Sequence, residues 1–138
     1  MNSSEFAKDL DLKTVSLQEV NTPTLKIIEN WNGFSVLKNE VKKMELNTPS
    51  IFELQKNDIK QLFNNLEVDI PNSLNSNNIL ARIKVLETNA YKFYKASSKY
   101  PKSSKQIKEI KNNTLRAYNI FIHQINKTHE KSVQLITK

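Results

Sequence analysis

The spacing of the apolar residues constrains this chain more than any other feature. In four stretches these residues recur at steps of three and four, which places them on one face of an α-helix. No run of β-branched residues alternates with polar ones, so no strand competes with this interpretation. Amphipathic helices joined by short connections pack as antiparallel neighbours. The sequence therefore predicts an all-α, up-down-up-down four-helix bundle over residues 22–138. The stripe residues are, helix by helix, Leu25, Ile28, Trp31, Phe34, Leu37, Val41 and Met44; Phe52, Ile59, Leu62, Phe63 and Leu66; Ile79, Ile83, Leu86, Ala90, Phe93 and Ser97; and Ile107, Ile110, Ala117, Tyr118, Phe121, Ile125, His129, Val133 and Ile136.

The first two helices have clear start signals and one internal ambiguity. Thr22-Pro23 begins the first helix, because proline is tolerated where its missing N–H would be unpaired anyway. Asn32-Gly33 is a turn signal inside that helix, but the stripe keeps its phase across it. We therefore expect one continuous or kinked helix rather than a break. Ser50 and Glu53 have the spacing of a capping box and predict the start of the second helix.

The third and fourth helices are the most regular part of the pattern. Alternating steps of four and three make the third stripe the cleanest heptad in the chain, and Tyr100-Pro101 closes it. Ser103 and Gln106 offer a capping box for the fourth helix, which has a stripe of about 30 residues, roughly 45 Å at 1.5 Å per residue. Residues 1–21 fit neither a helical nor a strand period for long, so we expect an irregular arm or tether.

Composition excludes several classes of chemistry. With 138 residues the chain is one domain, and without cysteine it has no disulfide, thiolate zinc site, iron–sulfur cluster or cysteine nucleophile. Gly33 is the only glycine, whereas phosphate-cradling loops and dinucleotide fingerprints need two or three. His123 and His129 are six residues apart, about 240° around a helix, so they cannot share one metal ion. The acidic residues and the serines show no arrangement along the chain that is typical of a catalytic site. We therefore expect no metal, no cofactor and no enzymatic activity.

Positive charge is concentrated in the second half of the chain. The formal net charge is +7, yet residues 71–138 carry thirteen bases against three acids. Seven of these lysines lie in the last turns of the third helix and the first turns of the fourth, which share one end of the bundle. This basic tip is a candidate contact for nucleic acid, anionic lipid or an acidic partner, and the alternative is a solvated lysine face. The seven lysines are Lys92, Lys95, Lys99, Lys102, Lys105, Lys108 and Lys111.

A second candidate site uses three residues from the apolar stripes. Trp31 stands beside the Asn32-Gly33 turn signal, and Met44 and His129 lie on the first and fourth stripes. Together they are a candidate ligand cavity, since a histidine and a methionine in a helical bundle can hold haem. The alternative is that all three pack as ordinary core or boundary side chains.

One stretch resembles a known group of proteins. Residues 70–75, Ile-Pro-Asn-Ser-Leu-Asn, and residues 81–90, Ala-Arg-Ile-Lys-Val-Leu-Glu-Thr-Asn-Ala, are similar to a segment of small uncharacterised helical envelope proteins of Gram-negative bacteria, often lipoproteins. The resemblance implies a periplasmic module on a tether, with Arg82 as a residue of interest. It carries no known ligand. The lipid-attachment cysteine is missing, so an envelope location requires that a leader was removed and that residues 1–6 replace it; otherwise the expected location is the cytoplasm.

These features together predict a binding protein rather than an enzyme. The leading interpretation is a helical-bundle module for protein–protein interaction, with the cell envelope as its candidate location. The alternative is anion or nucleic-acid binding through the lysine-rich tip between the third and fourth helices. No stretch reaches 18 consecutive apolar residues, so we expect no membrane span. The heptads do not separate an internal core from a shared seam, and the oligomeric state stays open.

Overall fold

The computed structural model describes residues 13–98 and 103–136, and every regular element in these ranges is helical. The predicted all-α class is therefore confirmed. Six α-helices and one 3₁₀ turn are assigned within the described residues. Their bounds are α2 Thr22–Ile28, α3 Asn32–Glu45, α4 Ile51–Leu54, α5 Lys56–Val68, η1 Asn72–Leu74, α6 Asn77–Ser98 and α7 Ser104–Ile136.

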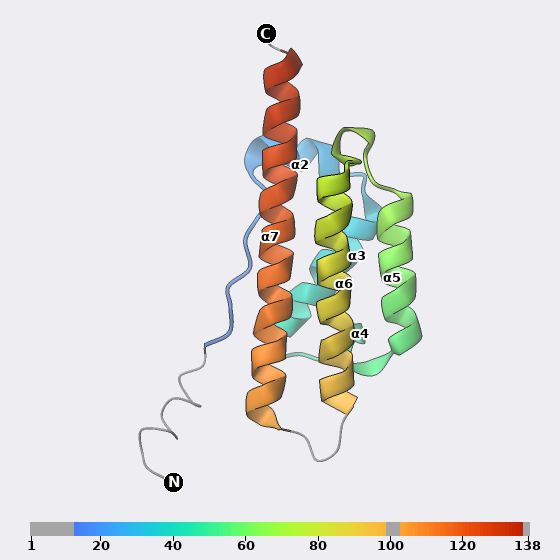
Figure 1. Ribbon diagram of the computed structural model, residues 1–138, viewed down its shortest axis with the longest axis vertical. Helices are drawn as coiled ribbons and strands as arrows, with labels where there is room; N and C mark the ends of the chain where they lie inside the picture. The colour runs from blue at the N-terminus through green and yellow to red at the C-terminus, as the bar shows by residue number, and fades with distance from the viewer. Residues whose placement is uncertain (1–12, 99–102, 137–138) are drawn as a thin grey trace.

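The long helices α5, α6 and α7 lie side by side, and α3 crosses behind them (Figure 1). Following the chain, α3 descends, α5 ascends, α6 descends and α7 ascends, while α2 crosses the upper end and α4 closes the lower end. Between these helices lies one core of apolar side chains. An aromatic cluster anchors it, with the ring of Trp31 centred 5.4 Å from Phe34 and 6.1 Å from Phe121.

The first predicted helix is broken, so the expectation of a continuous or kinked helix through Gly33 is wrong. Helix α2 ends at Ile28, a turn follows, and α3 begins at Asn32, with Trp31 at the corner between them at φ −88° and ψ 85°. The corner lets the Trp31 indole N–H donate to the backbone carbonyl of Leu66 at 3.0 Å. It also brings the backbone of Gly33 against that of Leu66. Tertiary packing against α5 decides the break, because the stripe alone keeps its phase.

The second predicted helix is also divided, at Gln55, whose φ of −139° is extended. The division lets Phe52 of α4 stack on Phe63 of α5, with ring centroids 6.2 Å apart. In one straight helix these residues would lie about 16 Å apart along the axis, at 1.5 Å per residue. Ser50 caps α4 as predicted, accepting from the Phe52 N–H at 3.2 Å. The buried Glu40 of α3 accepts from the neighbouring Ile51 N–H at 2.9 Å.

The third and fourth predicted helices are confirmed as α6 and α7. All six stripe residues of α6 are buried, and α7 runs for 33 residues. The Ser103 hydroxyl accepts from the Gln106 N–H at 3.3 Å, as a helix cap should. Tyr100-Pro101 lies outside the described residues.

The described part of the N-terminal arm, residues 13–21, is extended and lies along α7. Three asparagines of α7 hold it, which we call the asparagine ladder: Asn112, Asn119 and Asn126. The side-chain oxygens accept backbone N–H bonds from Val15, Gln18 and Asn21 at 2.9, 2.8 and 3.0 Å. The side-chain nitrogens of Asn112 and Asn119 donate to the carbonyls of Lys13 and Ser16, each at 2.9 Å.

The spacing of the asparagine ladder has a simple geometric cause. Its members are seven residues apart, about 10.5 Å along a helix at 1.5 Å per residue. The backbone N–H groups that they bind are three residues apart, about 10 Å along an extended chain at 3.3–3.4 Å per residue. The two repeats match, so a row of identical side chains can hold a segment of any sequence in register.

Candidate anion-binding site

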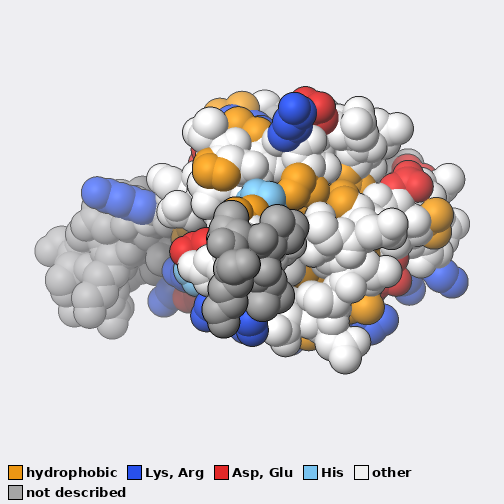
Figure 2. Space-filling model, turned by 90° about the horizontal axis from the view of Figure 1, so that it is seen from above, with side chains coloured by type: hydrophobic (Ala, Val, Ile, Leu, Met, Phe, Trp, Pro, Cys, Tyr) orange, Lys and Arg blue, Asp and Glu red, His pale blue; other side chains and the backbone are white. Residues whose placement is uncertain are grey.

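The antiparallel pairing of α6 and α7 brings five of the seven predicted lysines to one end of the molecule (Figure 1). Two lie in the last turns of α6 and three in the first turns of α7. Lys99 and Lys102 lie between these helices and outside the described residues. Figure 2 views the opposite end, where basic, acidic and hydrophobic side chains are scattered among other side chains and backbone. We call the five residues the lysine end: Lys92, Lys95, Lys105, Lys108 and Lys111.

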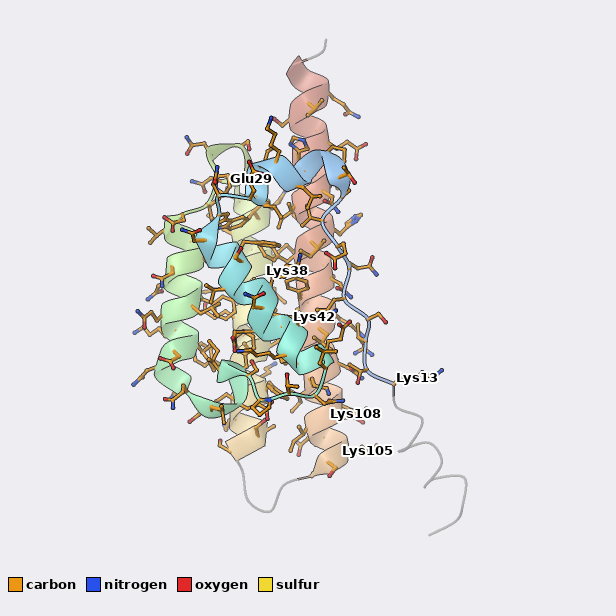
Figure 3. All side chains as sticks on the ribbon, turned by 180° about the vertical axis from the view of Figure 1, so that it is seen from behind. Lys13, Glu29, Lys38, Lys42, Lys105 and Lys108 are labelled. Atoms are coloured by element: carbon orange, nitrogen blue, oxygen red, sulfur yellow. The ribbon has the colours of Figure 1, made fainter. Side chains whose placement is uncertain are left out.

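The lysine end has two sides rather than one continuous stripe. Lys92 and Lys95 are exposed and line a shallow groove of about 210 Å³ with Gln106 and Ile110. On another side, Lys105 and Lys108 lie on the same face as Lys42 of α3 and Lys13 of the arm (Figure 3). Lys42 has an ion-pair partner there, Glu45 at 2.8 Å.

Lys111 differs from the other four because its side chain is buried, with only 8% of its surface exposed. Its ammonium donates to the side-chain oxygen of Asn47, a neutral partner. Asn47 follows α3 in the left-handed conformation, with φ 59°, which asparagine adopts more readily than most residues. No ion pair joins Lys111 to a carboxylate within the described residues. Burial lowers the pKa of the Lys111 ammonium, Lys108 lowers it further, and Glu53 acts in the opposite direction.

A surface groove of about 310 Å³ opens beside Lys111. It lies where the end of α3 and the short helix α4 meet α6 and the first turns of α7. One side is apolar and the other carries charged and amide groups. We call it the Lys111 groove; it is lined by Met44, Phe93 and Ile107 on the apolar side and by Asn47, Glu53, Lys108 and Lys111 on the polar side.

Sequence reasoning missed Asn47 and Glu53, and it treated the seven lysines as equivalent. Asn47 is not singled out among the predicted site residues, and Glu53 enters there only as part of a cap. A left-handed asparagine after a helix is a recognisable signal, but nothing local says that its side chain will meet a lysine 64 residues later. The asparagine ladder was missed too, although its seven-residue spacing is visible in the sequence.

The structure does not bring the predicted cavity residues Trp31, Met44 and His129 together. Trp31 precedes α3 and Met44 lies near its end, about 20 Å further along the helix at 1.5 Å per residue. Trp31 is a core residue held by its bond to Leu66, whereas Met44 lines the Lys111 groove. His129 of α7 is partly buried, and its Nδ1 has no hydrogen-bond partner in the described part of the chain.

Across residues 13–98 and 103–136, no three His, Asp or Glu side chains are grouped so as to hold a metal ion. In the same ranges no helix has both the length and the apolar content needed to cross a bilayer.

Comparisons with protein families, curated proteins and solved structures found no match to this chain. The fold and the site therefore define its class by themselves: an all-helical protein with a lysine-rich end and a groove beside a buried ammonium group. The similarity of residues 70–75 and 81–90 to envelope proteins stays a prediction.

Proposed function

We propose that this chain is a non-catalytic binding module that docks an acidic protein surface on its lysine end. One observation carries the proposal: between positions 92 and 111 the chain holds seven lysines and one acid, Glu109, and the α6–α7 pair folds the described members onto one end. Such a concentration of one sign of charge attracts an oppositely charged partner and speeds its encounter.

Helix electrostatics support a binding role. The N-terminus of a helix is the positive end of its dipole, so lysines in the first turns of α7 are unfavourable for its stability. Lys105 and Lys108 stand there, while Lys95 in the last turn of α6 is favourably placed. The placement of the α7 lysines is thus better explained by attraction of a partner than by helix stability.

The kind of base favours protein over nucleic acid as the partner. Nineteen of the 21 bases are lysine, and only Arg82 and Arg116 are arginine. Arginine recognises phosphates and base edges with paired hydrogen bonds, whereas lysine acts as a hydrated point charge. A field of point charges suits the scattered carboxylates of an acidic protein surface.

The test measures binding of fluorescent polyglutamate and of a random DNA duplex by anisotropy at 50 and 300 mM salt. The variant changes Lys92, Lys95 and Lys105 to glutamine, and a charge-matched control changes Lys26, Lys127 and Lys131, away from the lysine end. We expect polyglutamate binding that weakens steeply with salt, falls at least fivefold in the first variant and persists in the control. Equal losses in both variants would overturn the proposal. Tighter binding to DNA than to polyglutamate would replace the acidic protein with a nucleic acid.

We also propose that α3, α5, α6 and α7 form an up-and-down four-helix bundle, with α2 and α4 as accessory helices at its two ends. The alternating directions of the four long helices support this assignment (Figure 1).

A further inference from the structure

The Lys111 ammonium is the most unusual charged group in the described chain. Its residue is more than nine-tenths buried, and its single hydrogen-bond partner within the described residues is the neutral amide of Asn47. An ammonium has three N–H donors, so two have no hydrogen-bond partner among the described side chains and backbone. Burying a charge without a counter-ion is costly, and a negatively charged group beside it would recover much of that cost.

The Lys111 groove offers room for such a group. Its charged members are Lys108, Lys111 and Glu53, which together carry one net positive charge. A ligand with a single negative charge would make the groove neutral. Glu53 has no ion pair within the described residues, so it stays available to repel a second negative charge on the same ligand.

The opposite side of the groove is apolar, and the volume of the groove limits the size of the ligand. Met44 and Phe93 are almost fully buried, and Ile107 is partly buried. The volume of about 310 Å³ equals that of about ten water molecules at ~30 Å³ each. This is room for a carboxylate and one aliphatic group, about the size of a single apolar residue.

We propose that the Lys111 groove binds a small apolar monocarboxylate, with its carboxylate on the Lys111 ammonium and its apolar body against Met44, Phe93 and Ile107. This goes beyond the acidic-surface proposal, because it depends on the buried Lys111 and not on the exposed lysines. Two sources share this chemistry: a free short-chain carboxylic acid, and the C-terminal residue of a protein with an apolar last side chain.

The ligand test adds three probes to the full chain and measures their binding by calorimetry and by amide chemical shifts. N-acetylleucine represents a C-terminal residue, N-acetylleucinamide is its uncharged counterpart, and octanoate represents a free acid. We expect at least one carboxylate to bind at least tenfold more tightly than the amide, with shifts at residues of the groove. Tighter binding of N-acetylleucine assigns the source to a chain terminus, and tighter binding of octanoate assigns it to a free acid. If neither carboxylate outperforms the amide, the proposal is wrong.

The variant test separates Lys111 from the general positive charge. Lys111→Met keeps an apolar stem of similar length, and the exposed Asn47 can exchange its lost partner for water. We expect at least a tenfold loss of carboxylate binding, whereas Lys92→Met, outside the groove, should keep it. Unchanged binding in Lys111→Met would refute the assignment.

A second variant covers the case in which Lys111→Met does not fold. Glu53→Gln removes the one negative charge of the groove, and Glu53 is only partly buried. We expect it to bind the carboxylate a few-fold more tightly, and weaker binding would count against the proposal. The variant with Lys92, Lys95 and Lys105 changed to glutamine should keep its preference for the carboxylate over the amide. Failure of the acidic-surface proposal is therefore distinguishable from failure of this one.

Discussion

Gly33 and Leu66 meet backbone to backbone: a Cβ atom at Gly33 would lie 2.7 Å from the Cα atom of Leu66. The same added atom would lie 3.0 Å from the Leu66 nitrogen and 3.1 Å from the Asn65 carbonyl oxygen. These neighbours are backbone atoms of α5, which cannot move aside as a flexible side chain would. The single glycine of the chain therefore permits the close approach of α3 to α5.

We predict that Gly33→Ala destabilises the protein by about 1–3 kcal/mol, as overpacking of a well-packed contact usually does. This is the reverse of the usual effect inside a helix, where alanine is favoured over glycine by about 1 kcal/mol. Urea unfolding followed by the fluorescence of Trp31, the only tryptophan, measures the change. Ser35→Ala, at an exposed position of the same helix, is the control and should change stability by about 0.5 kcal/mol or less. A Gly33→Ala variant as stable as the wild type would show that α5 can shift without cost.

We predict that Asn119→Ala releases the middle of the arm. Asn119 accepts from the Gln18 N–H and donates to the Ser16 carbonyl, so the substitution removes two hydrogen bonds. Each is partly solvated, and we expect a loss of about 1 kcal/mol with faster amide exchange at Gln18. Asn113→Ala is the matched control, since Asn113 accepts from the exposed Arg116 side chain in the same helix and has no bond to residues 13–21 of the arm. Unchanged exchange at Gln18 would mean that the arm is held by its apolar side chains instead.

Glu45 makes the stability of the contact between the arm and α3 depend on pH in the acidic range. Its carboxylate accepts from Lys42 Nζ at 2.8 Å and from the Leu17 N–H at 2.7 Å, and the two bonds hold the pKa of this carboxyl below its usual value of 4.5. Because the folded-state pKa is lowered, the stabilisation is present above pH 4.5 and is lost as pH falls through the lowered value. We predict a titration midpoint below 4.5 for the Glu45 carboxyl carbon by NMR, moving upward in Lys42→Met. A midpoint at or above 4.5 in the wild type would contradict both contacts.

Lys111 makes stability depend on pH in the alkaline range, with the same sign as Glu45 has in acid. Burial lowers the pKa of its ammonium below 10.5, with Lys108 adding to the shift and Glu53 opposing it. Between the lowered value and 10.5 the unfolded chain binds more protons than the folded one, so stability from this group rises with pH. We predict that wild type gains stability relative to Lys111→Met as pH rises from 7 towards 10 in urea unfolding.

Tyr118 also titrates differently in the folded state, because burial raises the pKa of its hydroxyl. Since Tyr118 is present in both proteins, the comparison with Lys111→Met at each pH cancels its contribution. Lys92→Met, which removes an exposed charge, controls for net charge and should lack the trend. A constant difference between wild type and Lys111→Met across this pH range would show that the ammonium is as well solvated in the folded state as in the unfolded one.

The sequence alone determined the helical class and most of the core. Each stripe is a local property, because residues three and four apart share a face of a helix wherever it lies. That is why Ile79, Ile83 and Leu86 were predicted buried and are buried, and why the span of α7 was anticipated. The caps at Ser50 and Ser103 were predictable for the same reason, since a cap joins groups within one turn.

Only the tertiary structure decided the corners, the arm and the site. Asn32-Gly33 permits either a turn or a helix; in the structure both residues are helical, and the break falls just before them, at Trp31, where α3 packs closely on Leu66. The stacking of Phe52 on Phe63 likewise accompanies the division of the chain at Gln55. Lys111 follows Lys105 and Lys108 at the same three-residue step. Of these three lysines, however, only Lys111 is buried, where it meets the left-handed Asn47 after the end of α3. Burial of a charge depends on which distant segment packs over it, and that information is not local to any stretch of sequence.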